Sequence, residues 1–417
     1  MTRRIMLAIA LAATLVVGIS PAGAAPALGR VVSENPVDWT PHILDGSVWA
    51  MTVVGDTVVV GGDFTTVSSS DGYTEFDRWF LMAFSLSTGA VTRFAPWIDG
   101  PVYALTPGPD GTVLVGGDFT EVEGVPARSL ARLDVATGRV VPGFTASLRD
   151  GDVRALAAGG QWLYVGGRFD TIGGTPRAAL ARVDIRTGAV DRGFDAELDA
   201  PELDRVKVED VAVSPDGKRM IAAGALMDAM GEYRPQLAMF DISAPTVKLA
   251  DWYSYVYEPK CRKGFDTYLR AVDFSPDGSY FVAVSTGRMS KSGLLCDTAA
   301  RFETYGSNPH RPTWVNYTGG DSLYAVAVTG SAVYVGGHQR WLDNPYGHES
   351  AGPGAVSRPG ISAIDPKSGR ALDWNPTRSR GQGLRAFAVT PRGLLVGSDT
   401  DRLATEYHGR VGLFPPA

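Results

Sequence analysis

Polar side chains recur directly after the glycines that end strand-like apolar runs. Asp63 follows VVVGG, Asp118 follows TVLVGG, Arg168 follows LYVGG, His338 follows VYVGG and Asp399 follows LLVGS. We expect these five side chains to gather where the runs end. Three carboxylates, a guanidinium and an imidazole would form a polar ring able to hold a cation, a sugar or a basic peptide group. The alternative is a polar lining that holds only water.

The segment that begins at His338 has the densest mixture of aromatic and hydrogen-bonding side chains. Trp341 and Tyr346 offer flat apolar faces on which a sugar ring can stack, and the Asn344 amide can bond its hydroxyl groups. The alternative is that these aromatic side chains fill the core of their own loop. The predicted binding residues of this segment are His338, Gln339, Arg340, Trp341, Asn344 and Tyr346.

The metal-ligating residue types do not form a recognisable motif. His338, His348 and His408 are three of five histidines, but their spacing matches no zinc site. We therefore predict no metal site and no cofactor, and we keep open a calcium ion at the three aspartates of the polar ring.

A repeated unit positions these residues. Its two clearest copies run from Val102 to Phe144 and from Val153 to Phe194. Each copy holds four strand-like runs, A to D: VYAL or VRAL, TVLVGG or LYVGG, LARLDV or LARVDI, and RVVPGF or AVDRGF. Five further copies can be traced with the same order of runs. A repeat of this kind indicates a ring or array of small sheets.

The last copy lacks run D, and the chain supplies a matching run near its start. VDWTP at 37–41 resembles LDWNP at 372–376 of the sixth copy. We therefore predict an all-β, seven-bladed β-propeller of four-stranded antiparallel blades, with the last blade closed by the N-terminal strand. A sandwich does not explain seven copies in register, and an open solenoid does not explain the split copy. The predicted single domain spans 25–417, with blades near 46–100, 101–150, 151–201, 202–253, 254–318, 319–376, and 377–417 plus 31–42.

The predicted topology puts the long insertions on one face. In antiparallel blades the A–B and C–D turns share one face, and the B–C loops share the other with the links between blades. The long insertions are three B–C loops at 65–80, 285–298 and 338–359 and the link at 253–268. Loops on a rigid scaffold commonly carry binding residues, so we place the function on this face.

The first residues predict export. Arg3 and Arg4, an apolar run and the small residues Ala22-Gly23-Ala24 form a signal peptide over 1–24, and no later run is long enough to span a membrane. The two cysteines, Cys261 and Cys296, predict one disulfide in an exported chain. The net charge is -6 and no basic block stands out, so nucleic acid is excluded as a partner. We expect a secreted, extracellular monomer.

VGGDF, VGGRF and LARLDVATG resemble the delta-sixty type of bacterial propeller repeat and the wider quinoprotein-dehydrogenase-like propeller group, whose blades carry an A-x-D-x-x-TG stretch. The segment 336–376 resembles a C-terminal signature of secreted bacterial propellers to which no activity is assigned. The resemblance covers nearly the whole mature chain and implies the fold. True quinoproteins usually have eight blades and, in several types, adjacent cysteines, and this chain departs from both features.

Three functions follow as hypotheses. The first is a non-catalytic binding or scaffold module for an extracellular glycan or protein on the face with long loops. The second is a secreted polysaccharide hydrolase or lyase, with Asp63, Asp118 and Asp399 as acid and base and His338 as their partner. The third is a quinone-dependent oxidoreductase. We favour the binding module, because no hydrolase elbow, zinc-protease motif or phosphate loop occurs in the sequence.

Overall fold

The computed structural model describes residues 28–203, 205–258, 261–262, 265–288 and 293–417. The predicted signal peptide, residues 1–24, lies outside the described residues. Within the described part, all regular elements are strands and all strand pairings are antiparallel, so the all-β prediction is confirmed. No helix of this part is long and apolar enough to cross a membrane.

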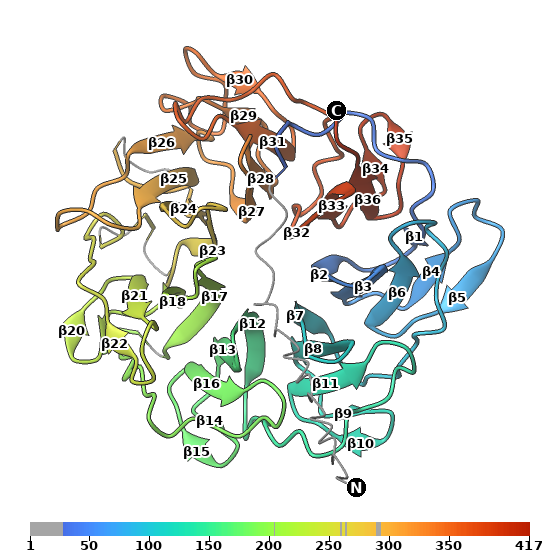
Figure 1. The fold of residues 1–417 in the computed structure, drawn as a ribbon. Coiled ribbons are helices and arrows are strands. Elements are labelled where there is room, and N and C mark those ends of the chain that lie inside the picture. Colours follow the sequence, from blue (N-terminus) through green and yellow to red (C-terminus); the bar gives the residue numbers. More distant parts are fainter. Residues whose placement is uncertain (1–27, 204, 259–260, 263–264, 289–292) are drawn as a thin grey trace, which may run out of the picture.

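Seven sheets of three or four strands follow one another along the described chain, and Figure 1 shows them arranged around a common centre. The innermost strand of each sheet comes first in sequence. In sequence order the sheets are β2 (Val48–Val54), β3 (Thr57–Gly62) and β6 (Leu81–Ser85); β7 (Val102–Pro107), β8 (Thr112–Gly117) and β11 (Leu130–Asp134); β12 (Asp152–Gly159), β13 (Trp162–Arg168) and β16 (Leu180–Asp184); β17 (Lys207–Val213), β18 (Arg219–Ala225), β21 (Leu237–Asp241) and β22 (Lys248–Leu249); β23 (Leu269–Phe274), β24 (Tyr280–Ser285), β25 (Thr298–Glu303) and β26 (Trp314–Tyr317); β27 (Leu323–Val328), β28 (Val333–Gly337) and β31 (Ile361–Ile364); β32 (Ala386–Thr390), β33 (Gly393–Gly397) and β36 (Val411–Phe414).

The prediction of four-stranded blades is wrong for five of these sheets, where run D forms no ladder in the described structure. In four of them run D is held by a single bridge, such as Leu133 with Val140. One cause is the Pro142-Gly143 pair soon after that bridge, because proline cannot donate to a ladder. A second cause is a buried arginine that takes a run D carbonyl, as Arg358 does through Nε to Leu372 O at 3.0 Å.

The B–C loops contain small sheets of their own, which the repeat pattern did not predict. Three of the hairpins turn over two residues with positive φ, for example Glu123 (53°) and Gly124 (73°), as a tight hairpin requires. The strands of these sheets are β9 (Glu121–Val122) with β10 (Val125–Pro126), β14 (Thr171–Ile172) with β15 (Thr175–Pro176), β19 (Asp228–Ala229) with β20 (Glu232–Tyr233), β29 (Trp341–Leu342) with β30 (Val356–Ser357), β34 (Arg402–Leu403) with β35 (Glu406–Tyr407), and β1 (His42–Ile43) with β4 (Thr66–Ser68) and β5 (Glu75–Asp77).

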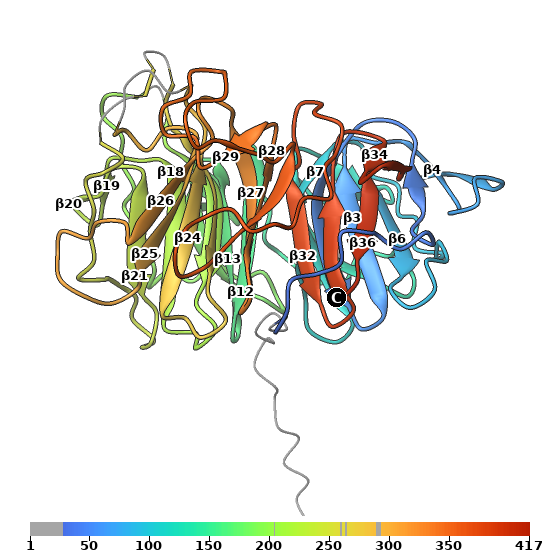
Figure 2. The ribbon, with the colours of Figure 1, turned by 90° about the horizontal axis from the view of Figure 1, so that it is seen from above.

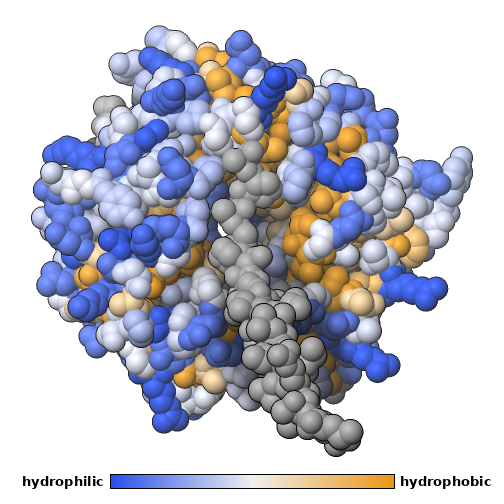
Figure 3. All heavy atoms as spheres, in the orientation of Figure 1, coloured by the Kyte–Doolittle hydropathy of each residue, from blue (hydrophilic) through white to orange (hydrophobic). Residues whose placement is uncertain are grey.

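The core lies between neighbouring sheets. Leu114 and Leu130 of the second sheet share a buried cluster with Val153 and Leu163 of the third. Glycine at the end of the second strand allows this approach, because a Cβ on Gly116 would collide with the Val153 side chain. Figure 2 shows the sheets side by side, and Figure 3 shows hydrophilic atoms along most of the rim.

The N-terminal segment runs beside the end of the chain. Val37 N donates to Leu413 O at 2.9 Å, Ser33 N donates to Pro415 O at 2.8 Å, and Ile43 N donates to Gly409 O at 2.7 Å. The Trp374 indole of the sixth sheet donates to Ser33 O at 3.0 Å. The segment therefore covers the outer edge of β36.

Candidate functional site

The inner strands share one irregularity near their first residues. In six of the described inner strands the register with the second strand slips by one residue, so that two residues face one. In β2, for example, Val48 faces Gly62 and Ala50 faces Gly61, which leaves Trp49 as the extra residue. A bulge of this kind turns a side chain out of the regular alternation. Here the extra residue borders the central channel.

We call the seven residues at this position the channel ring. Six are bulge residues, and the seventh, Arg385, directly precedes β32. The channel ring consists of Trp49, Tyr103, Arg154, Glu209, Arg270, Tyr324 and Arg385, one from each sheet, and all seven line one cavity in the channel.

Aromatic and charged contacts link the members of the channel ring. The Trp49 and Tyr103 rings meet edge to face at 5.5 Å, and the Arg154 guanidinium lies 5.7 Å from the Tyr103 ring centre. Glu209 accepts from Arg270 at 3.3 Å and lies 3.7 Å from Arg154. Together these contacts fix five neighbouring side chains.

Arg385 completes the contacts. Its guanidinium lies 4.3 Å from the Trp49 ring centre and 4.6 Å from that of Tyr324. Six of the seven neighbouring pairs in the channel ring are thus in contact, and Arg270 with Tyr324 is the pair for which the described structure records none.

A second cavity of about 660 Å³ lies above the channel ring, and we call it the mouth pocket. Its floor includes every member of the channel ring except Tyr103, which lines only the channel below. These six members are Trp49, Arg154, Glu209, Arg270, Tyr324 and Arg385. Its walls come from the link before the fifth sheet, the link between the fifth and sixth sheets, and two B–C loops. The wall residues are Arg262 and Phe265 of the first link, Gly320 and Ser322 of the second, and Thr286, Arg288, His338 and Glu349 of the loops.

 Six of the seven members of the channel ring border the mouth pocket. Only two of the long insertions and the link reach it, and the third, which contains β4 and β5, extends away from the centre (Figure 1). The mouth pocket therefore stands where the fifth and sixth sheets carry their insertions.

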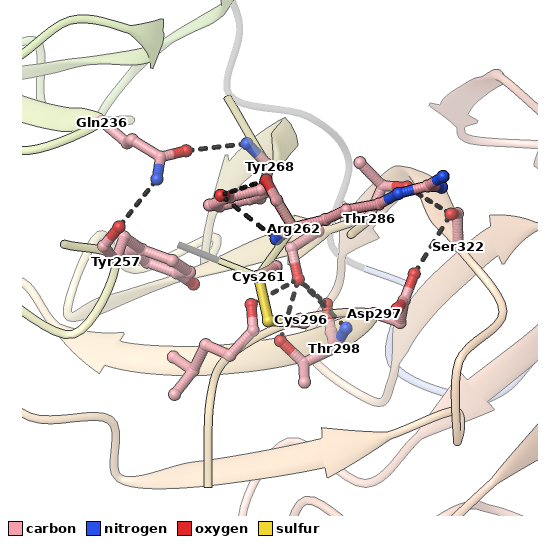
Figure 4. Close-up of a disulfide and its surroundings, with 12 residues drawn as sticks. Gln236, Tyr257, Cys261, Arg262, Tyr268, Thr286, Cys296, Asp297, Thr298 and Ser322 are labelled. Atoms are coloured by element: carbon pink, nitrogen blue, oxygen red, sulfur yellow. Dashed lines mark hydrogen bonds between the residues drawn. A yellow bond between two sulfur atoms is a disulfide. The ribbon is translucent and has the colours of Figure 1, made fainter. Parts of the chain in front are cut away.

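A disulfide anchors the wall formed by the link. Cys261 and Cys296 are bonded, with Cα atoms 5.8 Å apart, so the predicted disulfide is confirmed. Figure 4 shows Gln236 on the other side of the link, where its amide donates to Tyr257 O at 2.7 Å and accepts from Tyr268 N at 2.7 Å. These bonds hold the backbone on both sides of Arg262.

A salt bridge joins the two B–C loops of the wall. Arg288 Nε lies 2.8 Å from Glu349 Oε1. Both side chains border the mouth pocket, so the pair closes its wall between the fifth and sixth sheets.

The predicted polar ring lies next to the channel ring. Asp63 and Asp118 are exposed, and their charges add to the burial that raises the pKa of Tyr103. Arg168 bonds Asp152 at 3.1 Å, and Asp152 in turn bonds Arg154 at 2.9 Å. None of these three predicted residues borders the mouth pocket.

His338 is the predicted residue that does border the mouth pocket. Its Nε2 accepts from Ser322 N at 3.3 Å, so Nδ1 carries the proton and faces Tyr324 Oη at 3.1 Å and Gln382 O at 3.3 Å. Burial lowers the pKa of His338, which favours this neutral imidazole. Its place therefore suits the positioning of Tyr324.

Asp399 is occupied by its own surroundings. One oxygen accepts from Arg378 Nη2 at 2.6 Å and from Gly383 N at 3.2 Å, and the other accepts from Gln382 N. The carboxylate thus holds the chain segment just before Arg385.

The other predicted residues of the 338–346 segment mostly support its loop. Gln339 is buried and donates to Ser362 Oγ at 3.0 Å, and Asn344 is buried and donates to Thr318 O at 3.0 Å. Arg340 forms a salt bridge to Asp321 at 2.8 Å and lies 4.3 Å from the Trp341 ring centre. Tyr346 is exposed. None of these five residues borders the mouth pocket.

No metal centre is found in the described part of the chain, where no three His, Cys, Asp or Glu side chains gather as a possible ligand set. The carboxylates expected to bind calcium accept protein hydrogen bonds instead in two cases, Asp63 from Ser47 N and Asp399 as above.

None of the seven channel-ring residues was predicted from the sequence, and neither was the mouth pocket that they support. The missing signal is the second position of run A, which reads W, Y, R, E, R, Y and R across the copies. The residues beside it are Val or Leu before and Ala after in six of the copies, and Val208 and Asp210 in the fourth, so a large polar or aromatic side chain breaks the apolar pattern of the run.

Comparisons with known proteins extend only to the fold. A family model described as "Domain of unknown function (DUF5122) beta-propeller" matches residues 108–135. No curated protein matches the sequence. Among solved structures, the computationally designed Ika8 protein is 14% identical, covers 90% of this chain and 99% of its own, and has a TM-score of 0.48. The short family match supports a β-propeller family.

Proposed function

We propose that the seven sheets are the blades of a closed propeller and that the N-terminal segment serves as the outer strand of the last blade. The support comes from contacts between the chain ends. Gly397 of the last sheet lies against Val48 of the first, and both sheets contribute to one buried cluster. The hydrogen bonds from Ser33 and Val37 to the last strand region add to this support.

We further propose that the protein is a secreted, non-catalytic binding module that takes a carbohydrate into the mouth pocket. The signal-peptide pattern over 1–24 and the disulfide favour an extracellular site of action. A cavity of about 660 Å³ is in the range for small ligands, whereas a typical protein partner covers a far larger, flatter surface.

The observation that carries the proposal is the channel ring. Each sheet contributes one side chain to it, and these side chains make an aromatic and hydrogen-bonding floor under the mouth pocket. Aromatic faces beside polar groups suit sugars, whose rings are apolar on one face and carry hydroxyl groups at the edge. Such a floor is fixed by its own contacts and needs little rearrangement to bind.

The hydrolase alternative has less support. It requires a carboxylate that is free to act as acid or base and a histidine partner. Asp399 is engaged through both oxygens, and both ring nitrogens of His338 face protein groups. No feature of the described structure favours a quinone cofactor over a simple ligand.

A carbohydrate array with the mature protein tests the binding proposal. Trp49→Leu removes an aromatic face from the floor and should weaken any hit by about tenfold. Trp341→Leu is the matched control, because Trp341 is half-buried outside the mouth pocket. Thermal unfolding of both variants verifies their folding.

The result that would overturn the proposal is a set of hits that survives Trp49→Leu and disappears with Trp341→Leu. The protein could instead capture a protein or peptide, with the same dependence on Trp49. That result would support the mouth pocket as the binding site and overturn a carbohydrate as its ligand.

A further inference from the structure

The mouth pocket carries positive charge in a chain that is acidic as a whole. Its lining contains five arginines and two glutamates, an excess of three formal positive charges, whereas the chain has a net charge of -6. His338 adds none, because burial lowers its pKa. Positive charge in a cavity with low-dielectric walls attracts anions.

The five arginines are not equivalent. Arg154 is engaged by Asp152 and Glu209, Arg270 by Glu209, and Arg288 by Glu349. Arg262 lies at the exposed outer wall. Arg385 is the inner arginine for which the described residues supply neither a carboxylate partner nor a side-chain hydrogen bond.

The place of Arg385 makes this lack of partners informative. Its guanidinium lies near the Trp49 and Tyr324 rings, and burial lowers the pKa of Arg385 without neutralising it at ordinary pH. Arg385 lines both cavities, so a group that enters the mouth pocket comes close to this side chain. A guanidinium has five donors in a fork that matches the two oxygens of a carboxylate.

A second unpaired donor lies beside it. The Trp49 Nε1–H is buried and has no hydrogen-bond partner among the described residues. A buried donor left without an acceptor is costly, so partners are normally present in the functional state. Trp49 and Arg385 are in contact, and no described residue offers a hydrogen-bond acceptor to either side chain.

The geometry points to an acidic carbohydrate as the ligand of the mouth pocket, with its carboxylate bound by Arg385 and Trp49. This inference rests on the proposed function and adds the charge of the ligand. A carboxylate supplies two acceptors to the two donors, and the sugar ring to which it is attached would lie on the aromatic part of the floor.

Isothermal titration calorimetry with matched ligands tests the inference. The probes are trigalacturonate and its fully methyl-esterified form, which differ in carboxylate charge, with sodium phosphate and sodium sulfate as separate arms. We expect trigalacturonate to bind at least tenfold more tightly than the ester, and its affinity to fall as sodium chloride is added.

Substitutions then locate the site. Arg385→Met keeps a long apolar side chain but removes the charge, and we expect it to weaken trigalacturonate binding at least tenfold. Arg385→Lys keeps the charge without the fork and should recover only part of the affinity. Arg186→Met is the control, because Arg186 is an exposed arginine outside both cavities. Thermal unfolding confirms that each variant is folded.

The outcomes separate this inference from the proposed function. Equal binding of acid and ester, with no effect of Arg385→Met, would overturn the acidic ligand and leave carbohydrate binding intact. Binding of phosphate or sulfate alone, lost in Arg385→Met, would support an oxyanion site and overturn the carbohydrate. Failure of every anion to bind would overturn the inference.

Discussion

Two buried aspartates should make the stability of this protein depend on pH. Burial raises the pKa of Asp210 to about 7 and that of Asp273 to about 7. Asp210 accepts from Val272 N at 2.8 Å and Asp273 accepts from Val328 N at 2.7 Å, so each carboxyl group joins its inner strand to the next sheet. Unfolding returns both groups to water, where their pKa is about 3.9.

The sign and size of the effect follow from this difference. Between about pH 4 and about pH 7 the folded protein holds protons that the unfolded chain releases, so the free energy of unfolding falls as the pH rises. The slope is at most about 1.4 kcal/mol per pH unit for each group, and about 4 kcal/mol for one group over the whole window. Above about pH 7 the contribution is constant.

Asp210→Asn removes the titration of one of the two groups. The amide is neutral at every pH and keeps an oxygen that can accept from Val272 N. Urea unfolding of both proteins at pH 5, 6, 7 and 8 gives the difference in the free energy of unfolding. As the pH rises, we expect the free energy of unfolding of Asp210→Asn to increase relative to that of the natural protein by up to about 1.4 kcal/mol per pH unit. This difference should become constant above about pH 7.

The difference between Asp210→Asn and the natural protein cancels the effect of titrating groups that both proteins share. Burial lowers the pKa of four histidines, so they reduce the free energy of unfolding as the pH falls below their usual pKa. These histidines are present in both proteins, so their effect cancels in the difference. They are His42, His310, His338 and His408. Asp118→Asn controls for the loss of one exposed carboxylate. A difference that stays flat from pH 5 to pH 8 would refute the reasoning. Asp210→Asn should also lower the pKa of Asp273, to which the Asp210 charge contributes.

Two further predictions concern stability. Replacing both cysteines in Cys261→Ser/Cys296→Ser, which opens a loop with a sequence separation of 35, should lower the free energy of unfolding by roughly 3–4 kcal/mol in urea; an unchanged midpoint would contradict the predicted contribution. Trp374→Ala should cost roughly 3–5 kcal/mol, because the indole is buried against Tyr334 and Phe414 and bonds Ser33 O. The exposed Trp97→Ala is its control, and equal losses in the two variants would show that packing of the N-terminal segment contributes little.

The sequence was sufficient for the strands because their signals are local. Apolar runs ending in glycine pairs predicted β3, β8, β13 and β28, and the cysteines predicted their own bond. The outer run was predicted as a strand in each blade, yet ladder formation there depends on distant arginines such as Arg358, which no local pattern reveals.

The candidate site was harder to predict because a bulge breaks the alternation on which the analysis relied. The residue that follows the glycines of the second run was predicted to face the channel. In the last copy this residue is Asp399, which lies near Arg385 but binds backbone N–H groups. The channel ring depends on a slipped register between β2 and β3 and its counterparts, and only pairing between strands defines that slip.

The extra residue in each inner strand has a consequence for how this scaffold can change. A regular strand residue is constrained by neighbours on its own face, so its replacement alters the packing of two sheets. A bulge residue borders the open channel instead, and Trp49, Arg154 and Glu209 occupy equivalent places despite their different sizes and charges. The residues that pack the sheets are thus different from those that line the channel, so the channel-ring side chains can be exchanged with little effect on the packing of the sheets.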